Sequence, residues 1–82
     1  MKTIKKANKN TKAEDFLAEH LAYIEKMCGR KATICNLGWY QSPTIIESKV
    51  TDKDGFDWII HSEAYSNGRY HHERWAQKGF DQ

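Results

Sequence analysis

The sequence has little cysteine and proline and no long apolar run. Among its 82 residues are two cysteines and one proline, and two cysteines are too few for the disulfide framework of many small secreted domains. No apolar stretch approaches the ~18 residues of a membrane-spanning helix. The basic start is followed by an amphipathic segment instead of the apolar core of a signal peptide. These absences predict a cytoplasmic protein with reduced thiols and no membrane contact.

A metal-binding motif is also missing from the sequence. Cys28 and Cys35 are separated by six residues, whereas the paired cysteines of zinc knuckles are separated by about two to four. The adjacent histidines His71 and His72 point to opposite faces of a strand, so they do not converge on one ion. We expect neither a metal nor another cofactor.

The length of the chain limits its function as well as its fold. A chain of 82 residues forms one domain that buries little more than ~60% of its unfolded surface, which leaves little room for a deep catalytic pocket. Aromatic residues make up 12% of the chain, and they supply enough apolar surface for a compact core. A binding function is therefore favoured over an enzymatic one.

The net charge of +2 conceals an uneven distribution. The first twelve residues contain no acidic residue and five basic ones, which are Lys2, Lys5, Lys6, Lys9 and Lys12. The polar, aperiodic composition predicts a flexible basic tail over residues 1–10 and a single small domain over residues 11–82. These lysines serve either as an electrostatic arm for nucleic acid or an acidic partner, or as a solubilising leader.

Apolar residues recur at spacings of three and four over residues 12–28, which indicates an amphipathic helix. Thr11 and Glu14 have the spacing of a capping box at its start. Gly29 suits the left-handed position that follows a helix. His20 lies beside the apolar stripe, where we expect it to cover the edge of the core.

β-branched and aromatic residues in the second half of the chain predict three or four strands. Residues 44–50 and 57–65 form the clearest pair, and Gly55 between them fits the left-handed position of a three-residue hairpin loop. This loop pairs Asp52 with Phe56 and thereby sets the register of both strands. The predicted fold is α+β, with one N-terminal amphipathic helix packed on a three- to four-stranded antiparallel sheet in the order α-β-β-β(-β).

Asn67 and Gly68 form the strongest short hairpin signal in the chain. A two-residue turn at this dipeptide pairs Tyr65 with Tyr70 and continues that register along the last strand. Trp75 then faces the helix and joins the core. The opposite face of the sheet receives aromatic, basic and histidine side chains, namely Tyr65, Tyr70, His61, His72 and Arg74.

This mixture favours a protein-binding function, because tyrosine, tryptophan and arginine most often anchor interfaces. The predicted partner-binding residues are Tyr65, Tyr70, Arg69, Arg74, His61, His72, Trp39 and Tyr40. We expect a monomer, or a homodimer formed through an edge strand of the sheet.

Two other functions remain open from the sequence. In the first, the tyrosines stack on single-stranded DNA or RNA while arginines and the lysine tail contact phosphates. In the second, His61 and His72 act as general acid and base in a small metal-independent ribonuclease.

In size, in its isolated domain and in its basic leader, the chain resembles small phage-encoded accessory proteins that bind and disable a host enzyme or defence complex, such as anti-CRISPR proteins. The resemblance is one of format and not of motif. It implies a stoichiometric inhibitor without enzymatic activity that acts in the cytoplasm of a host cell.

Overall fold

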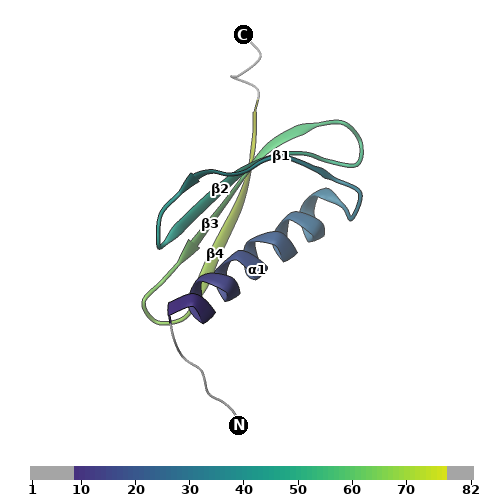
Figure 1. Cartoon of the computed structure of the whole chain (residues 1–82). Helices are drawn as coiled ribbons and strands as arrows, with labels where there is room; N and C mark the ends of the chain where they lie inside the picture. The colour runs from purple at the N-terminus through teal and green to yellow at the C-terminus, as the bar shows by residue number, and fades with distance from the viewer. Residues whose placement is uncertain (1–8, 78–82) are drawn as a thin grey trace.

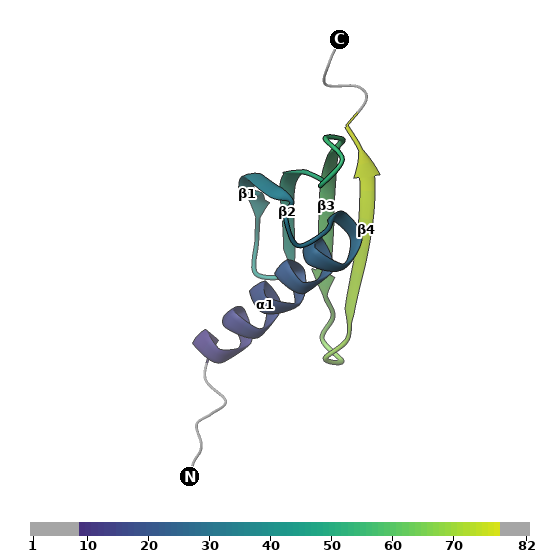
Figure 2. The same ribbon diagram turned by 90° about the vertical axis from the view of Figure 1, so that its right-hand side faces the viewer.

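The computed structural model describes residues 9–77, which form one helix and four strands (Figure 1). In chain order the elements are α1 (Lys9–Cys28), β1 (Thr33–Gln41), β2 (Ile45–Thr51), β3 (Asp57–Ala64) and β4 (Tyr70–Ala76). The strands form one antiparallel sheet in the order β1-β2-β3-β4, and α1 packs across one face of it (Figure 2). The predicted α+β fold and its element order are confirmed.

The helix begins at Lys9, before the predicted capping box, and it ends at Cys28. Gly29 follows with a φ of 99°, the left-handed conformation expected after a helix. The predicted tail lysines Lys2, Lys5 and Lys6 lie outside the described residues. Within residues 9–77, no helix has the length and apolar character that crossing a membrane requires.

The hairpin of β2 and β3 has the predicted register, in which Val50 pairs with Trp58. The Asp52 amide donates to the Phe56 carbonyl at 2.8 Å, and Gly55 between them has a φ of 91°. The Asp52 carboxylate also accepts hydrogen bonds from the Phe56 amide and the Trp58 indole, each at 2.9 Å. These contacts fix both the loop and the pairing of the strands.

The predicted register of β3 and β4 is wrong by one residue. The Tyr65 amide donates to the Arg69 carbonyl at 2.8 Å, so Tyr65 pairs with Arg69 and not with Tyr70. Gly68, with a φ of 87°, is therefore the third residue of a three-residue loop, as Gly55 is in the preceding hairpin. An Asn-Gly dipeptide is compatible with a two-residue and with a three-residue loop, and the structure has the three-residue loop.

This one-residue shift moves every side chain of β4 to the opposite face of the sheet. Trp75 pairs with Ile59 and stacks on His61, on the face away from α1, so its predicted place in the core is wrong. The β4 side chains that contact the helix are instead Tyr70, His72 and Arg74.

The core lies between the C-terminal half of α1 and the central strands. The apolar residues at its centre are Ile24, Cys28, Val50 and Ile60. Full burial of one aliphatic side chain contributes about 1.5–3 kcal/mol, so this cluster holds the helix on the sheet. Arg74 covers one side of it, because its guanidinium donates to the Met27 carbonyl at 2.9 Å and lies 3.9 Å from the ring centroid of Trp58.

β1 is an edge strand without acidic or basic residues. Its large exposed side chains are Ile34, Leu37, Trp39 and Tyr40. Two register shifts interrupt its pairing with β2, and the second of them spans Gly38, which has a φ of 67°. The Gly38 amide donates to the Ser48 hydroxyl at 2.9 Å. β1 therefore combines exposed apolar side chains with an irregular path.

Candidate protein-binding surface

We call the sheet face opposite α1 the open face. The observed pairing brings to it Tyr40, Glu47, Lys49, Ile59, His61, Glu63, His71, Glu73 and Trp75. Trp39 lies beside them, since the Lys49 ammonium is 4.7 Å from its ring centroid. Trp39, Tyr40 and Trp75 are 44%, 49% and 41% exposed, so this face offers three accessible aromatic side chains.

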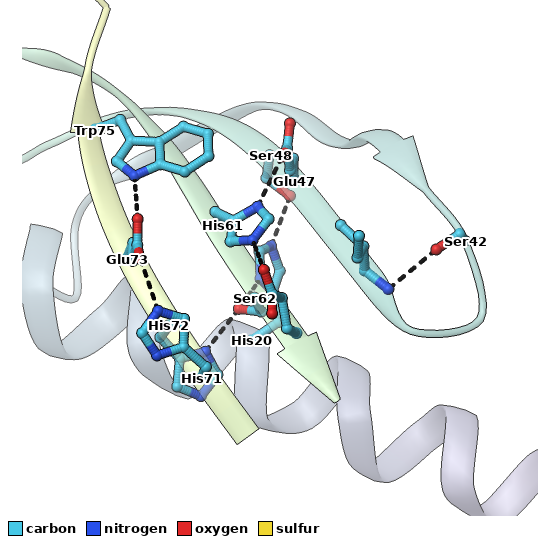
Figure 3. Close-up of polar contacts among 12 residues, drawn as sticks. His20, Ser42, Glu47, Ser48, His61, Ser62, His71, His72, Glu73 and Trp75 are labelled. Atoms are coloured by element: carbon cyan, nitrogen blue, oxygen red, sulfur yellow. Dashed lines mark hydrogen bonds and ion pairs between the residues drawn. The ribbon is translucent and has the colours of Figure 1, made fainter. Parts of the chain in front are cut away.

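A histidine held between two glutamates occupies the open face (Figure 3). His61 Nδ1 lies 2.7 Å from Glu47, which is directly across on β2, and its Nε2 lies 2.7 Å from Glu63, on the same strand. An ionised carboxylate only accepts hydrogen bonds, and both ring nitrogens of a histidine donate only in its protonated form, so this arrangement favours the positively charged ring. We call Glu47, His61 and Glu63 the carboxylate clamp.

Burial and charge act on the pKa of His61 in opposite directions. The residue is 7% exposed, and burial alone lowers its pKa. Hydrogen bonds to Glu63 and Glu47, together with their negative charges, outweigh burial and raise the pKa above 6.5. The bond from His61, assisted by the Tyr65 hydroxyl, lowers the pKa of Glu63 below 4.5. His61 and Glu63 are therefore both ionised at mildly acidic pH.

Trp75 connects the clamp to β4. Its ring stacks on His61, with the centroids 4.8 Å apart and the planes 18° apart, and the face of an indole attracts a cation. The indole nitrogen donates to one oxygen of Glu73 at 2.5 Å, while the other oxygen lies 2.7 Å from His71 Nε2. Sequence reasoning missed Trp75 and Glu73 because the incorrect register turned both towards the helix.

The β4 residues that were predicted on the open face contact α1 instead. Tyr70 stacks on Phe16 with the centroids 5.8 Å apart, and His72 stacks on Tyr23 at 4.7 Å. His61 and His72 consequently lie on opposite faces of the sheet. The structure therefore does not bring together the two histidines on which the ribonuclease hypothesis depends.

A second histidine network joins α1 to the inner face of the sheet (Figure 3). His20 is fully buried, and its two ring nitrogens each lie 2.7 Å from a hydroxyl, that of Ser62 and that of Ser48. Ser62 also bonds His72 Nδ1 at 2.7 Å. Burial, together with the charges of His72 and His61, lowers the pKa of His20 to about 4. His20 thus lies inside the core as a neutral structural residue, and not at its edge as predicted.

The structure divides the predicted partner-binding residues among three places. His61, Trp39 and Tyr40 are on the open face, Tyr65 and Arg69 are exposed at the β3–β4 hairpin end, and Tyr70, His72 and Arg74 pack towards α1. Of the predicted tail lysines, Lys9 and Lys12 belong to the first turns of α1.

Within the part of the chain that the structure describes, no three His, Cys, Asp or Glu side chains are placed to hold a metal ion. Cys28 is buried in the core and Cys35 is exposed on β1, and both are free thiols. No protein-family model, curated protein or solved structure matches this chain.

Proposed function

We propose that the chain acts by stoichiometric binding of a protein partner through the open face. The observation that carries the proposal is the placement of Trp39, Tyr40 and Trp75, whose accessible rings flank a clamp with satisfied polar groups. Aromatic side chains often anchor protein interfaces. Hydrogen bonds hold the side chains of the clamp in place between these rings, which reduces the conformational entropy lost when a partner binds.

The charge of the open face favours protein over nucleic acid as the ligand. Glu47, Glu63 and Glu73 lie among the aromatic side chains, and Lys49 is the one lysine or arginine among the paired residues of this face. Phosphate groups bind surfaces rich in lysine and arginine, so this face disfavours them. The nucleic-acid alternative depends instead on the lysines of the first twelve residues.

We propose that the chain inhibits its protein partner by covering part of the partner's surface. The bound domain covers a surface that its partner, a host enzyme or defence complex, needs for its own activity. A fixed, aromatic, non-enzymatic surface supports this form, as does the small single-domain format of the chain.

Affinity capture from a nuclease-treated lysate at moderate salt tests the proposal. Tyr40→Ala and Trp39→Ala should each weaken partner binding about 30-fold, because an aromatic hot spot contributes about 2 kcal/mol. Phe56→Ala is the matched control, since Phe56 is 64% exposed in the β2–β3 loop and outside the open face. Circular dichroism verifies that each variant is folded. A partner that both face variants retain at wild-type affinity contradicts the proposal, and so does capture that disappears on nuclease treatment.

A further inference from the structure

A chain of hydrogen bonds crosses the sheet from β4 to β1 on the face that packs against α1. His72 Nδ1 on β4 lies 2.7 Å from the Ser62 hydroxyl on β3, which lies 2.7 Å from His20 Nδ1. His20 Nε2 lies 2.7 Å from the Ser48 hydroxyl on β2, which accepts from the Gly38 amide on β1 at 2.9 Å. Figure 3 shows its histidines and serines. We call these five residues the serine–histidine relay.

The middle of the relay is closed to water. His20, Ser48 and Ser62 are each 0% exposed. Among the described residues, neither serine hydroxyl bonds a group outside the relay. A buried polar group without a hydrogen-bond partner is unfavourable. Each hydroxyl proton therefore has to be donated to another member of the relay.

The Gly38 amide sets the direction in which the relay donates. A backbone amide only donates, whereas a hydroxyl donates one proton and accepts up to two. Ser48 accepts from Gly38, so its own proton goes to His20 Nε2. The proton of the neutral His20 ring is then on Nδ1 and is donated to Ser62, and Ser62 donates to His72 Nδ1. Every buried proton has an acceptor in this direction, and His72 carries its proton on Nε2.

Protonation of His72 reverses this direction. Both nitrogens of a protonated imidazole donate, so His72 Nδ1 donates to Ser62, and Ser62 donates to His20 Nδ1 instead. The neutral His20 then carries its proton on Nε2 and donates to Ser48. The Ser48 proton is left without an acceptor in the relay, and rotation of the hydroxyl towards another acceptor breaks its bond to Gly38. Water can replace this bond, because Gly38 is only half-buried on an edge strand.

We propose that the serine–histidine relay is a pH-sensitive switch, in which protonation of His72 on β4 releases the Gly38 amide on β1. Gly38 lies within the second register shift of β1 and directly precedes Trp39 and Tyr40. Its release loosens the strand at these two exposed rings. An effect on partner binding rests on the function proposed for the open face, whereas the switch itself does not.

The groups around His72 determine when the switch operates. Burial lowers the pKa of His72, the negative charge of Glu19 on α1 raises it, and the charge of His71 lowers it. Because the pKa of His20 is about 4, His20 stays neutral while His72 becomes protonated. On β3 the ring faces the uncharged Ser62. Further titratable or charged groups on the elements around the ring are Tyr23 on α1 and Tyr70 and Arg74 on β4.

NMR spectroscopy of the full chain tests the switch. At about pH 8, the nitrogen shifts of the rings should place the proton on Nδ1 of His20 and on Nε2 of His72. On acidification to about pH 4.5, the Gly38 amide should shift with the midpoint of His72. Its protection against hydrogen exchange, corrected for the intrinsic effect of pH, should fall at least about tenfold. These readouts need no binding partner, so they are independent of the open-face proposal.

Three variants locate the coupling. His72→Phe keeps an aromatic ring against Tyr23 and removes the titrating group, so the Gly38 amide should lose this transition. Ser62→Ala breaks the relay, so His72 should still titrate without a response at Gly38. His71→Gln is the matched control, because His71 lies on the opposite face and bonds Glu73 outside the relay. In this variant Gly38 should still follow His72. Thermal unfolding verifies that each variant is folded.

Three results would overturn the switch. A Gly38 amide that does not change through the midpoint of His72 rejects the coupling. A Gly38 transition that persists in His72→Phe assigns the response to another group. A His20 proton on Nε2 at about pH 8 rejects the direction of the relay. The wild-type measurements alone decide the first and third points, so they hold even where a variant does not fold.

Discussion

His61 connects three strands through side chains alone. It bonds Glu47 on β2 and Glu63 on β3, and its ring stacks on Trp75 from β4. The two glutamates raise the pKa of His61 and so favour its protonated form, whereas burial by itself lowers that pKa. The clamp thus couples the protonation of one residue to the stability of the sheet.

His61→Gln should destabilise the domain by about 2 kcal/mol near pH 6, less than the loss for a fully buried ion pair. Gln carries no charge, so Glu47 and Glu63 are left to repel each other. The folded-state pKa of His61 lies above 6.5, so its stabilisation is fully present below pH 6.5 and is lost as pH rises through that pKa. Urea unfolding at a series of pH values measures both effects. A variant whose stability falls above pH 6.5 as steeply as that of wild type would contradict the charged clamp.

His20 should affect stability in the opposite direction. Its pKa of about 4 lies below 6.5, so its stabilisation is fully present above pH 6.5 and is lost as pH falls towards 4. A shift of this size corresponds to about 3 kcal/mol. In an NMR titration of the ring protons, His20 should have a midpoint near 4 and His61 one above 6.5. Burial also lowers the pKa of His72, which should titrate below 6.5. A His20 midpoint near 6.5 would be inconsistent with its burial.

The two tight hairpin loops, residues 53–55 and 66–68, have the same form. Each is three residues long and ends in a left-handed glycine. The first was predicted correctly, while the second was misread because Asn-Gly is also the strongest signal for a two-residue turn. The sequence feature that the two loops share is a glycine as third residue. A three-residue loop at residues 66–68 places Trp75 on the open face.

The other elements differed in how far the sequence could predict them. The helix and the β2–β3 register were predictable because apolar periodicity and one loop length determine them. The path of β1 was not, since it depends on a tertiary contact in which the Gly38 amide bonds the Ser48 hydroxyl. Local patterns carry no information about such a contact between strands.

Deleting Ser66 should destabilise the domain by more than about 3 kcal/mol, because a two-residue loop turns all β4 side chains over. The Phe16–Tyr70 stack is then lost, and the charged Glu73 faces the helix. Ser66→Ala keeps the loop length and should remain within about 0.5 kcal/mol of wild type. Urea unfolding compares the two. A deletion variant as stable as Ser66→Ala would show that loop length does not set the register.

Across the whole molecule, the lysines at the start of the sequence and the acidic open face have opposite charge. Affinity for single-stranded DNA should therefore depend on the lysines. Removal of residues 1–8 should weaken binding of a labelled oligothymidylate at least about tenfold at low salt, and about 200 mM salt should nearly eliminate it. Tyr40→Ala should have no effect in the same anisotropy assay. If it weakens binding as much as the truncation does, the open face stacks bases and its glutamates do not exclude nucleic acid.

The candidate surfaces of the molecule could be predicted only in part from the sequence. Trp39, Tyr40 and His61 could be named as candidates from residue type, because exposed aromatics and histidines suggest binding wherever they fall. The cavity of about 510 Å³ under the N-terminal half of α1 could not be identified, since it is lined by Ala13 and Ala64, which are far apart in the sequence and lie beside the Phe16–Tyr70 stack. A space between two elements has no local sequence pattern.

The irregular path of β1 has a consequence for aggregation. Charged side chains discourage many edge strands from pairing with other strands, but β1 has no charged residue. A regular β1 would offer an uncharged edge to a strand of a second molecule, and head-to-tail pairing that does not close into a ring grows into a filament. The left-handed Gly38, anchored to Ser48, breaks the register of β1 along its length. In this protein a backbone bulge supplies the protection against fibre growth that charged side chains supply elsewhere.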